Sequence, residues 1–454
     1  GLLLVLSYIN LSKAFFILVF IRYHSSIFSS KQFCSSSVAI LCYIFLFLLM
    51  INPSYLFHVG FQLSFFITFA LLMSNRILEK NKHRGMVWQS FVVTSICQLC
   101  SLPIILYYFH EFSLWGFLLN VIYIPLYTVI LLPATFLVFC ISLLSLPGAS
   151  WFTSGLESLF HLVNTFAVFM AKLPYVSLAF GKPSFLFVFF LSLLIILFFY
   201  FWEKRNKQYM YICLSVLFLF LLLFYHKVSL SPYGEVTFID VGQGDSVLIK
   251  QPFGREVYLI DTGGVMNFGQ EAWEMRRKTY DPGQDIVVPL LKSKGIRKID
   301  KLILTHDDQD HIGGGVAILQ AIQVDEILVP EALKEGFSET AVANLAKKQG
   351  IPLVYGKMGQ AWRAGGDTFR ILHPSKYEED SNESSLVLMA EINHVRWLFT
   401  GDVGEIGERE IIKRYQKLRV DVLKVGHHGS KTSSSEAFLE ATHARVAIIS
   451  AGVN

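Results

Sequence analysis

A dense group of side chains that bind metal ions follows a short apolar run at residues 302–304. Its members, all within six residues, are His306, Asp308, Asp310 and His311. In an extended segment alternate residues point the same way, which would turn the first three of them toward one side. Imidazole and carboxylate groups at this density suit a divalent cation such as Zn²⁺ or Mn²⁺. A solvated acidic loop before a glycine turn is the plainer alternative, but the apolar run that leads into the group argues against it.

Three other apolar runs in the second half of the chain also end in residues of the kind that bind metals. Asp261, Asp402 and the pair His427 and His428 each follow one such run. A single aspartate at a strand end means little. Four such ends at separate places indicate a sandwich of sheets that carries a metal site at its edge.

Composition divides the chain of 454 residues into two halves. The chain is 53% hydrophobic, which is too apolar for an ordinary soluble protein. Residues 1–226 carry four acidic and twelve basic side chains, a net charge of +8, and the remainder has a net charge of −4. All six cysteines lie in the first half, which excludes thiolate metal sites in the second. We expect a membrane domain at residues 1–229 and a soluble domain at residues 230–454, the latter truncated at its C-terminus.

Several apolar segments approach the ~20 residues that a helix needs to cross a membrane. They are residues 2–21, 38–51, 53–74, 87–109, 113–147, 155–171, 184–202 and 209–225. The most basic loops, at 76–84 and 203–207, are expected in the cytoplasm. The last span then runs outward, so the soluble domain is expected outside the cell membrane. Pro125 and Pro133 interrupt the segment 113–147, which is either a kinked helix or a re-entrant piece.

Polar residues within the first half resemble the pattern of a known family. The pattern consists of Asn52-Pro53, the run VGFQLSF at 59–65, Leu102-Pro103, Tyr107-Tyr108-Phe109, Gly116, Asn120 and Pro125. It resembles the competence domain of ComEC-type DNA internalisation proteins. The resemblance implies a polytopic membrane channel for single-stranded DNA, which Gln62 and Asn120 would help to line. Composition and spacing alone indicate only a helical bundle with polar groups inside it.

The second half alternates predicted strands and helices, which is typical of an α/β fold. Strands are expected at residues 235–240, 247–250, 256–260, 298–304, 326–329, 351–355, 384–391, 395–399, 420–425 and 446–450, and helices at 286–293, 316–323 and 338–349. The motifs DVGQGDS, IDTGG, THDDQDH, TGD and VGHHGS, in this order, resemble the metallo-β-lactamase-like domain of the same family. The resemblance implies an αββα sandwich, two sheets covered by helices.

The same resemblance implies two divalent metal ions, Zn²⁺ or Mn²⁺, and the residues that bind them. The ligands it implies are His306, Asp308, Asp310, His311, Asp402 and His427. The first two would hold one ion, the next two would hold the other, and Asp402 would bridge them. His427 is preferred to His428 because it is the first residue past the strand. Asp310 and Asp402 are the expected catalytic residues. From their residue types alone, Ser246, Ser430 and Lys431 are candidate contacts to substrate phosphate, and a role in turns and in surface solvation is an equal alternative for them.

Two features of this site depart from the family pattern. The motif of the superfamily usually has a histidine where this chain has Asp308. The superfamily also often supplies a histidine before the TGD strand, where this chain has Asn382, Ser384 and Ser385, with His373 farther away. Both departures weaken the first metal position, and a site richer in carboxylate is less selective for zinc.

These features predict a multi-pass membrane protein of natural competence that takes up DNA, with an external metal-dependent nuclease that degrades the strand left outside. The implied partners are DNA, the membrane and other competence proteins. The sequence does not decide whether the chain also forms a homo-oligomer. One alternative is a metal-dependent phosphodiesterase that acts on envelope components, and another is a channel with a non-catalytic, regulatory metal domain. The net negative charge of the second half opposes DNA binding unless a local basic patch exists, for example at residues 276–278 with Lys292 and Lys294.

Overall fold

The computed structural model describes residues 37–144, 149–171, 177–265, 280–375 and 380–452. The predicted span at residues 2–21 lies outside the described residues. The chain forms two compact units, Gly1–Tyr225 and His226–Asn454, and each is described by itself.

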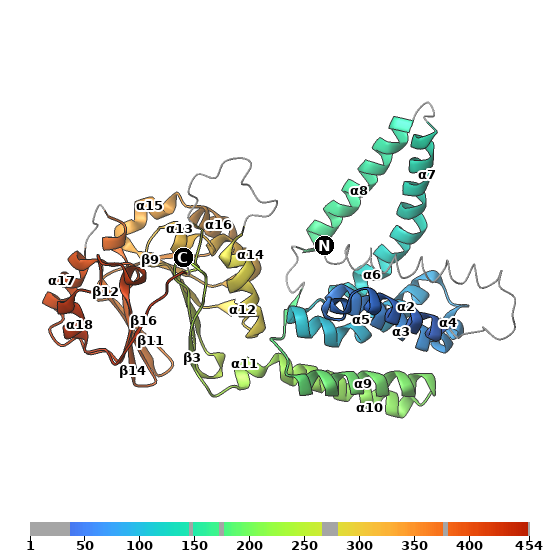
Figure 1. The fold of residues 1–454 in the computed structure, drawn as a ribbon, viewed down its shortest axis with the longest axis horizontal. Helices are drawn as coiled ribbons and strands as arrows, with labels where there is room; N and C mark the ends of the chain where they lie inside the picture. Colours follow the sequence, from blue (N-terminus) through green and yellow to red (C-terminus); the bar gives the residue numbers. More distant parts are fainter. Residues whose placement is uncertain (1–36, 145–148, 172–176, 266–279, 376–379, 453–454) are drawn as a thin grey trace. The chain divides into compact units, whose positions relative to one another are not determined.

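The first unit is built from helices, which are apolar except for the short α4 (Figure 1). They are α2 (Ser37–Ile51), α3 (Val59–Met73), α4 (Asn75–Asn81), α5 (Met86–Phe109), α6 (Trp115–Pro125), α7 (Leu132–Leu143), α8 (Ala149–Ala171), α9 (Phe185–Glu203) and α10 (Lys207–Tyr225). A π-helical stretch, Leu126–Leu131, joins α6 to α7, so Pro125 and Pro133 do not end the run Trp115–Leu143. By length and composition, four of the described helices can cross a membrane: α5, this run, α9 and α10. The pair α3 and α4, bent by 62°, would be a fifth span.

Helix α5 is central to this unit and contacts α3, α4, α6 and α9. Its side chains Ile96 and Leu106 are fully buried. Helices α9 and α10 lie side by side (Figure 1). Between them the rings of Phe187 and Phe220 stack with their centroids 4.3 Å apart. Close packing of large apolar side chains therefore holds the helices of this unit together.

The second unit contains two mixed sheets of six strands each. The first, in the order β10-β9-β7-β5-β4-β3, consists of β3 (Glu235–Phe238), β4 (Val247–Lys250), β5 (Val257–Ile260), β7 (Lys301–Ile303), β9 (Ile327–Pro330) and β10 (Leu353–Gly356). The second, in the order β11 to β16, consists of β11 (Ala361–Ala364), β12 (Asp367–His373), β13 (Val387–Ile392), β14 (Val395–Phe399), β15 (Val422–Lys424) and β16 (Val446–Ile448). Strands β5, β7, β9 and β10 are parallel, and so are β14, β15 and β16. The carboxyl ends of the parallel strands therefore meet at one edge of each sheet.

The two sheets pack face to face and helices cover their outer faces (Figure 1). The core between the sheets includes Tyr258 and Phe369, whose ring centroids are 4.9 Å apart. The first sheet is covered by α12 (Val288–Ser293), α14 (Gly315–Ala321) and α16 (Ala341–Gln349), and the second by α17 (Glu405–Arg414) and α18 (Glu436–Thr442). This is the αββα sandwich that the sequence predicts, and the prediction of fold class is confirmed.

Some elements differ from the sequence prediction. The helix expected at 338–349 is α16, which begins three residues later because Thr340 caps it by accepting a bond from the N–H of Ala343 at 3.2 Å. A short helix that was not predicted, α15 (Lys334–Ser338), precedes it. Strands β11 and β12 and helices α17 and α18 were not predicted. Helix α17 consists mainly of charged residues, so its few apolar side chains give only a weak periodic signal.

Candidate metal centre

The ends of strands from both sheets bring four candidate ligands together. In the first sheet, β7 leads to the short helix α13 (Gln309–Ile312), which carries Asp310 and His311. In the second sheet, β14 leads to Asp402, and β15 leads to a turn in which His428 has a left-handed φ of 54°. The extended spacing expected for residues 306–310 is therefore replaced by one turn of helix, which places its two ligands side by side.

Two loops that contain glycine lie in close contact with the backbone of α13. A Cβ atom at Gly244 would lie 1.8 Å from the carbonyl oxygen of Asp310, and one at Gly264 would lie 1.6 Å from that of Gln309. The N–H of Thr262 donates to the carbonyl oxygen of His311 at 2.7 Å. Only glycine permits such a close approach, which explains why the motifs DVGQGDS and IDTGG carry glycines here.

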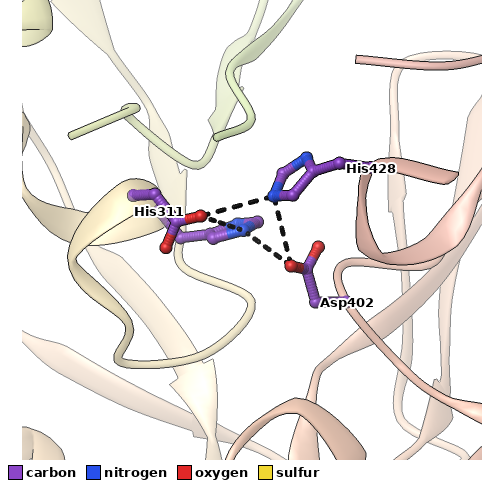
Figure 2. Close-up of side chains that lie close together, drawn as sticks. His311, Asp402 and His428 are labelled. Carbon is purple, nitrogen blue, oxygen red and sulfur yellow. Dashed lines mark ion pairs between the residues drawn. The ribbon is translucent and has the colours of Figure 1, made fainter. Parts of the chain in front are cut away.

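The side chains of His311, Asp402 and His428 converge on one point (Figure 2), and Asp310 belongs to the same group. Each offers one ligand atom, and these atoms all lie within 4.8 Å of one another. Nε2 of His311 and Nε2 of His428 lie 3.3 Å and 3.2 Å from Oδ2 of Asp402. Beyond their contacts with these carboxylates, both nitrogens are buried and make no hydrogen bond. Two imidazoles and two carboxylates that converge in this way fit a divalent ion such as Zn²⁺ or Mn²⁺.

The carboxylates determine the charge of both imidazoles. Burial alone would lower the pKa of His311, but Asp261 and Asp402 outweigh it and raise that pKa well above its ordinary value. Likewise, burial of His428 is outweighed by Asp310 and Asp402, which raise the pKa of His428 to about 9. Burial of Asp402 is in turn outweighed by the bonds from the two histidines, which hold the pKa of this carboxyl far below its usual range. Without a metal ion, protons on the histidines thus supply the positive charge.

A buried aspartate behind the group orients His311. Oδ2 of Asp261 lies 2.9 Å from Nδ1 of His311. The N–H and the hydroxyl of Thr305 donate to the same carboxylate at 2.8 Å and 2.7 Å. A proton on Nδ1 directed at Asp261 leaves Nε2 for the group, an arrangement common among histidines that bind metals. From sequence, Asp261 was one of the strand-end residues of the kind that bind metals. In the structure it contacts and orients His311, which is a candidate ligand.

A buried lysine supports the group from the other side. Lys424 is 3% exposed, forms an ion pair with Asp245, and donates to the carbonyl oxygen of Gly401 at 2.9 Å. Its Nζ lies 3.6 Å from Oδ1 of Asp402. Burial opposes its charge, but Asp245 and Asp402 raise the pKa of Lys424, so it stays cationic. Lys424 and Asp245 were not predicted from sequence, although a charge within the apolar run 420–425 is a signal that a partner exists.

His306 and Asp308, the ligands expected for a first ion, lie beside the four-residue group but are not members of it. Nε2 of His306 is 3.6 Å from Oδ2 of Asp308, and Ser381 donates to Oδ1 of Asp308 at 2.9 Å. His373, the nearest alternative histidine in sequence, has its Nε2 2.7 Å from the carbonyl oxygen of Glu383. This hydrogen bond occupies Nε2 of His373, so that nitrogen is not a ligand of the four-residue group.

The structure brings His428 into the group, and not His427, which the sequence analysis preferred. Strand β15 ends at Lys424, so His427 is not the first residue past it. Nδ1 of His427 lies 3.2 Å from the hydroxyl of Thr432. Both histidines have left-handed backbone angles, and the sharp turn they form directs only the second ring toward Asp402.

The residues expected to contact substrate or to line a channel lie in different settings. Ser246 is 1% exposed and its hydroxyl donates to the carbonyl oxygen of Asp261 at 3.1 Å, so it cannot reach a substrate. Ser430 is half-buried and Lys431 is exposed, both close in sequence to His428. Nε2 of Gln62 donates to the Tyr108 hydroxyl at 2.9 Å, and Asn120 lies half-buried on α6.

Both halves of the chain match known families in the order found here. Residues 16–205 match the family model for competence proteins, and residues 239–453 match the model for the metallo-beta-lactamase superfamily. ComE operon protein 3 of Bacillus subtilis is 35% identical over 419 residues, which cover 92% of this chain and 54% of that protein. The chain belongs to the ComEC-type competence proteins.

Two other relatives match a smaller share of this ComEC-type chain. Recombination protein 2 of Haemophilus influenzae is 33% identical over 232 residues, covering 51% of this chain and 26% of that protein. Competence protein ComA of Neisseria gonorrhoeae is 32% identical over 219 residues, covering 48% and 27%. The chain thus spans about half the length of the B. subtilis relative and about a quarter of the other two.

The two adjacent histidines of this ComEC-type chain should differ strongly in their effect on metal binding. We expect His428→Ala to weaken binding of Mn²⁺ about 100-fold or more, because it removes a converging nitrogen. His427→Ala should change the affinity by less than about threefold, because its ring faces Thr432. Titration calorimetry of the purified protein measures both. Equal losses for the two variants would contradict the assignment of His428.

Metal affinity should increase with pH. In the metal-free protein the pKa of His428 is raised to about 9, and that of His311 is raised as well. An ion must displace these protons, so below about pH 9 the apparent association constant should rise about tenfold per pH unit for each proton displaced. Competition with a chelating dye at pH 6, 7 and 8 tests this. An affinity that stays constant over this range would show that the histidines are neutral before the metal binds.

Proposed function

We propose that this ComEC-type chain acts in DNA uptake across the cell membrane, and that its second unit hydrolyses the strand that is not transported. The observation that carries the proposal is the group of Asp310, His311, Asp402 and His428, whose possible ligand atoms all lie within 4.8 Å of one another. The succession of a competence region and a metallo-β-lactamase region supports it.

In this proposal the four-residue group holds one divalent ion, Zn²⁺ or Mn²⁺, and His306 with Asp308 contributes to a second position. Such ions supply Lewis acidity to a phosphoryl oxygen and lower the pKa of water. The chain itself fixes the geometry: Asp261 holds the ring of His311 in place. The exposed Lys431, three residues after His428, would contact a substrate phosphate together with Ser430.

The first unit would form the membrane channel, with Gln62 and Asn120 on the path of the transported strand. The basic loops at 76–84 and 203–207 belong to the same end of this unit, because Nη1 of Arg76 lies 3.2 Å from Oε1 of Glu203. The excess of basic residues favours the cytoplasm for that end. Helix α10 then leads outward, which puts the second unit outside the cell membrane.

Metal-dependent cleavage of DNA by the purified full chain in detergent tests this function. We expect linear DNA to be cut with Mn²⁺ or Zn²⁺, and Asp310→Ala to reduce the rate at least about 1000-fold. Asp325→Ala is the matched control, because Asp325 is an exposed aspartate paired with Lys298. A folded, metal-loaded protein that leaves DNA intact would refute the nuclease assignment. Hydrolysis of small phosphodiesters without cleavage of DNA would favour action on envelope components.

A further inference from the structure

A basic pocket lies at the edge of the second sheet opposite to the metal centre. It has a volume of about 430 Å³ and is lined by Arg396, Arg419, Val420, Asp421, His443 and Arg445. Strands β14, β15 and β16 are parallel. Arg396, Asp421 and Arg445 lie at or just before the starts of these strands, whereas the metal ligands Asp402 and His428 follow the ends of the first two.

The single acidic group in the pocket is already occupied. Oδ2 of Asp421 accepts bonds from the N–H of Arg396 at 2.9 Å and from its Nε at 3.4 Å. Arg419 and Arg445 are exposed, and within the described part of the chain neither side chain forms a hydrogen bond or ion pair. Two guanidinium groups therefore remain available to an anion in the pocket.

Neighbouring residues extend the positive charge around this pocket. The segment 413–419, which leads from α17 to Arg419, has four basic residues and no acidic one. Its lysines and arginines are all exposed. By contrast, the patch suggested by sequence at 276–278 lies outside the described residues, and Lys294 is ion-paired with Glu235. Within a unit of net negative charge, the pocket concentrates basic groups at one place.

We propose that this pocket binds a backbone phosphate of the DNA strand that the metal centre cleaves, an inference that rests on the proposed function. Guanidinium groups suit this ligand because their paired N–H donors match two phosphate oxygens.

The separation of the two sites suits a polymer rather than a small diester. Arg396 and Asp402 are six residues apart along β14 and the turn that follows it, so they lie at most about 20 Å apart at ~3.3 Å per residue. A stacked single strand advances about 3.4 Å per nucleotide along its axis, so roughly six nucleotides cover this distance at most. A strand cut at the metal centre can therefore also reach the pocket, whereas a dinucleotide cannot.

The test compares Arg419→Gln/Arg445→Gln with Lys347→Gln/Lys348→Gln, a matched change of two exposed lysines on α16. Full chains in detergent are titrated with a fluorescent single-stranded 20-mer between 50 and 200 mM NaCl, with EDTA present to prevent cleavage. We expect the arginine variant to bind at least about tenfold more weakly at 50 mM NaCl. The slope of log K against log salt should fall by about 0.7, the value for the loss of one phosphate contact. The lysine variant should match the unmodified protein.

A second readout separates this inference from the function on which it rests. Hydrolysis of bis(4-nitrophenyl) phosphate with Mn²⁺ should be unchanged in the arginine variant, because its two residues are remote from the metal centre. If the unmodified protein binds the 20-mer but never cuts DNA, the nuclease assignment fails and the pocket stands. Unchanged 20-mer affinity in the arginine variant would overturn the inference. The inference would also be overturned if the arginine variant bound the 20-mer normally but bound vesicles of anionic phospholipid more weakly. That result would make the pocket a membrane contact.

Discussion

Replacing Lys424 with methionine should lower the free energy of unfolding of the metal-free second unit by about 3–5 kcal/mol. Lys424 is 3% exposed and its cation is the ion-pair partner of Asp245, which is 2% exposed. Methionine fills a similar volume but removes the closest counter-charge of the buried Asp245, which leaves the more distant imidazoles of His428 and His311, 3.8 Å and 4.0 Å away. The loss of one member of a buried pair is therefore far more harmful than the loss of a surface charge.

Urea unfolding of the His226–Asn454 unit in EDTA measures this loss. The unit can be studied alone, because its three hydrophobic clusters consist only of its own residues. The double variant Asp245→Asn/Lys424→Met removes both charges and should recover at least half of the lost stability. A loss below about 1 kcal/mol for Lys424→Met would show that water or another group compensates Asp245.

The types of residue at strand ends made the metal centre predictable from sequence. Asp310, His311 and Asp402 each follow an apolar run, and parallel strands bring such ends to one edge of a sheet. The choice between His427 and His428 was not predictable in this way. It depends on left-handed backbone angles in a four-residue turn, and strand periodicity carries no information about which ring a turn directs inward.

The charges that support the ligands were harder to predict than the ligands. Asp245 and Lys424 come from different sheets and are far apart in the chain, so no local pattern links them. The burial of Lys424 within an apolar run signals that a partner must exist, but not which residue it is. In the first unit, hydropathy located the apolar helices, whereas the continuity of the run Trp115–Leu143 through Pro125 depends on a π-helical stretch that composition does not reveal.

Replacing Gly264 with alanine should destabilise the second unit by about 3 kcal/mol or more and should also weaken metal binding. The added Cβ would lie 1.6 Å from the carbonyl oxygen of Gln309 and 2.6 Å from its carbonyl carbon. Both atoms belong to the backbone of α13, so no side-chain rotation can relieve the clash. Either the loop or the helix must move, and the helix carries Asp310 and His311.

Gly366→Ala is the matched control, because a Cβ at Gly366 meets nothing within 4 Å. It should change the free energy of unfolding by less than about 0.5 kcal/mol. Urea unfolding in EDTA and Mn²⁺ titration of both variants separate two effects of Gly264→Ala. If the loop that contains residue 264 moves, the free energy of unfolding falls but the affinity for Mn²⁺ does not change. If α13 moves, the free energy of unfolding and the affinity for Mn²⁺ both fall. We expect the second result, because Gly244 presses on the same helix from another loop, 1.8 Å from the Asp310 carbonyl oxygen by the same measure. A helix held by two loops that both require glycine cannot shift without moving its metal ligands.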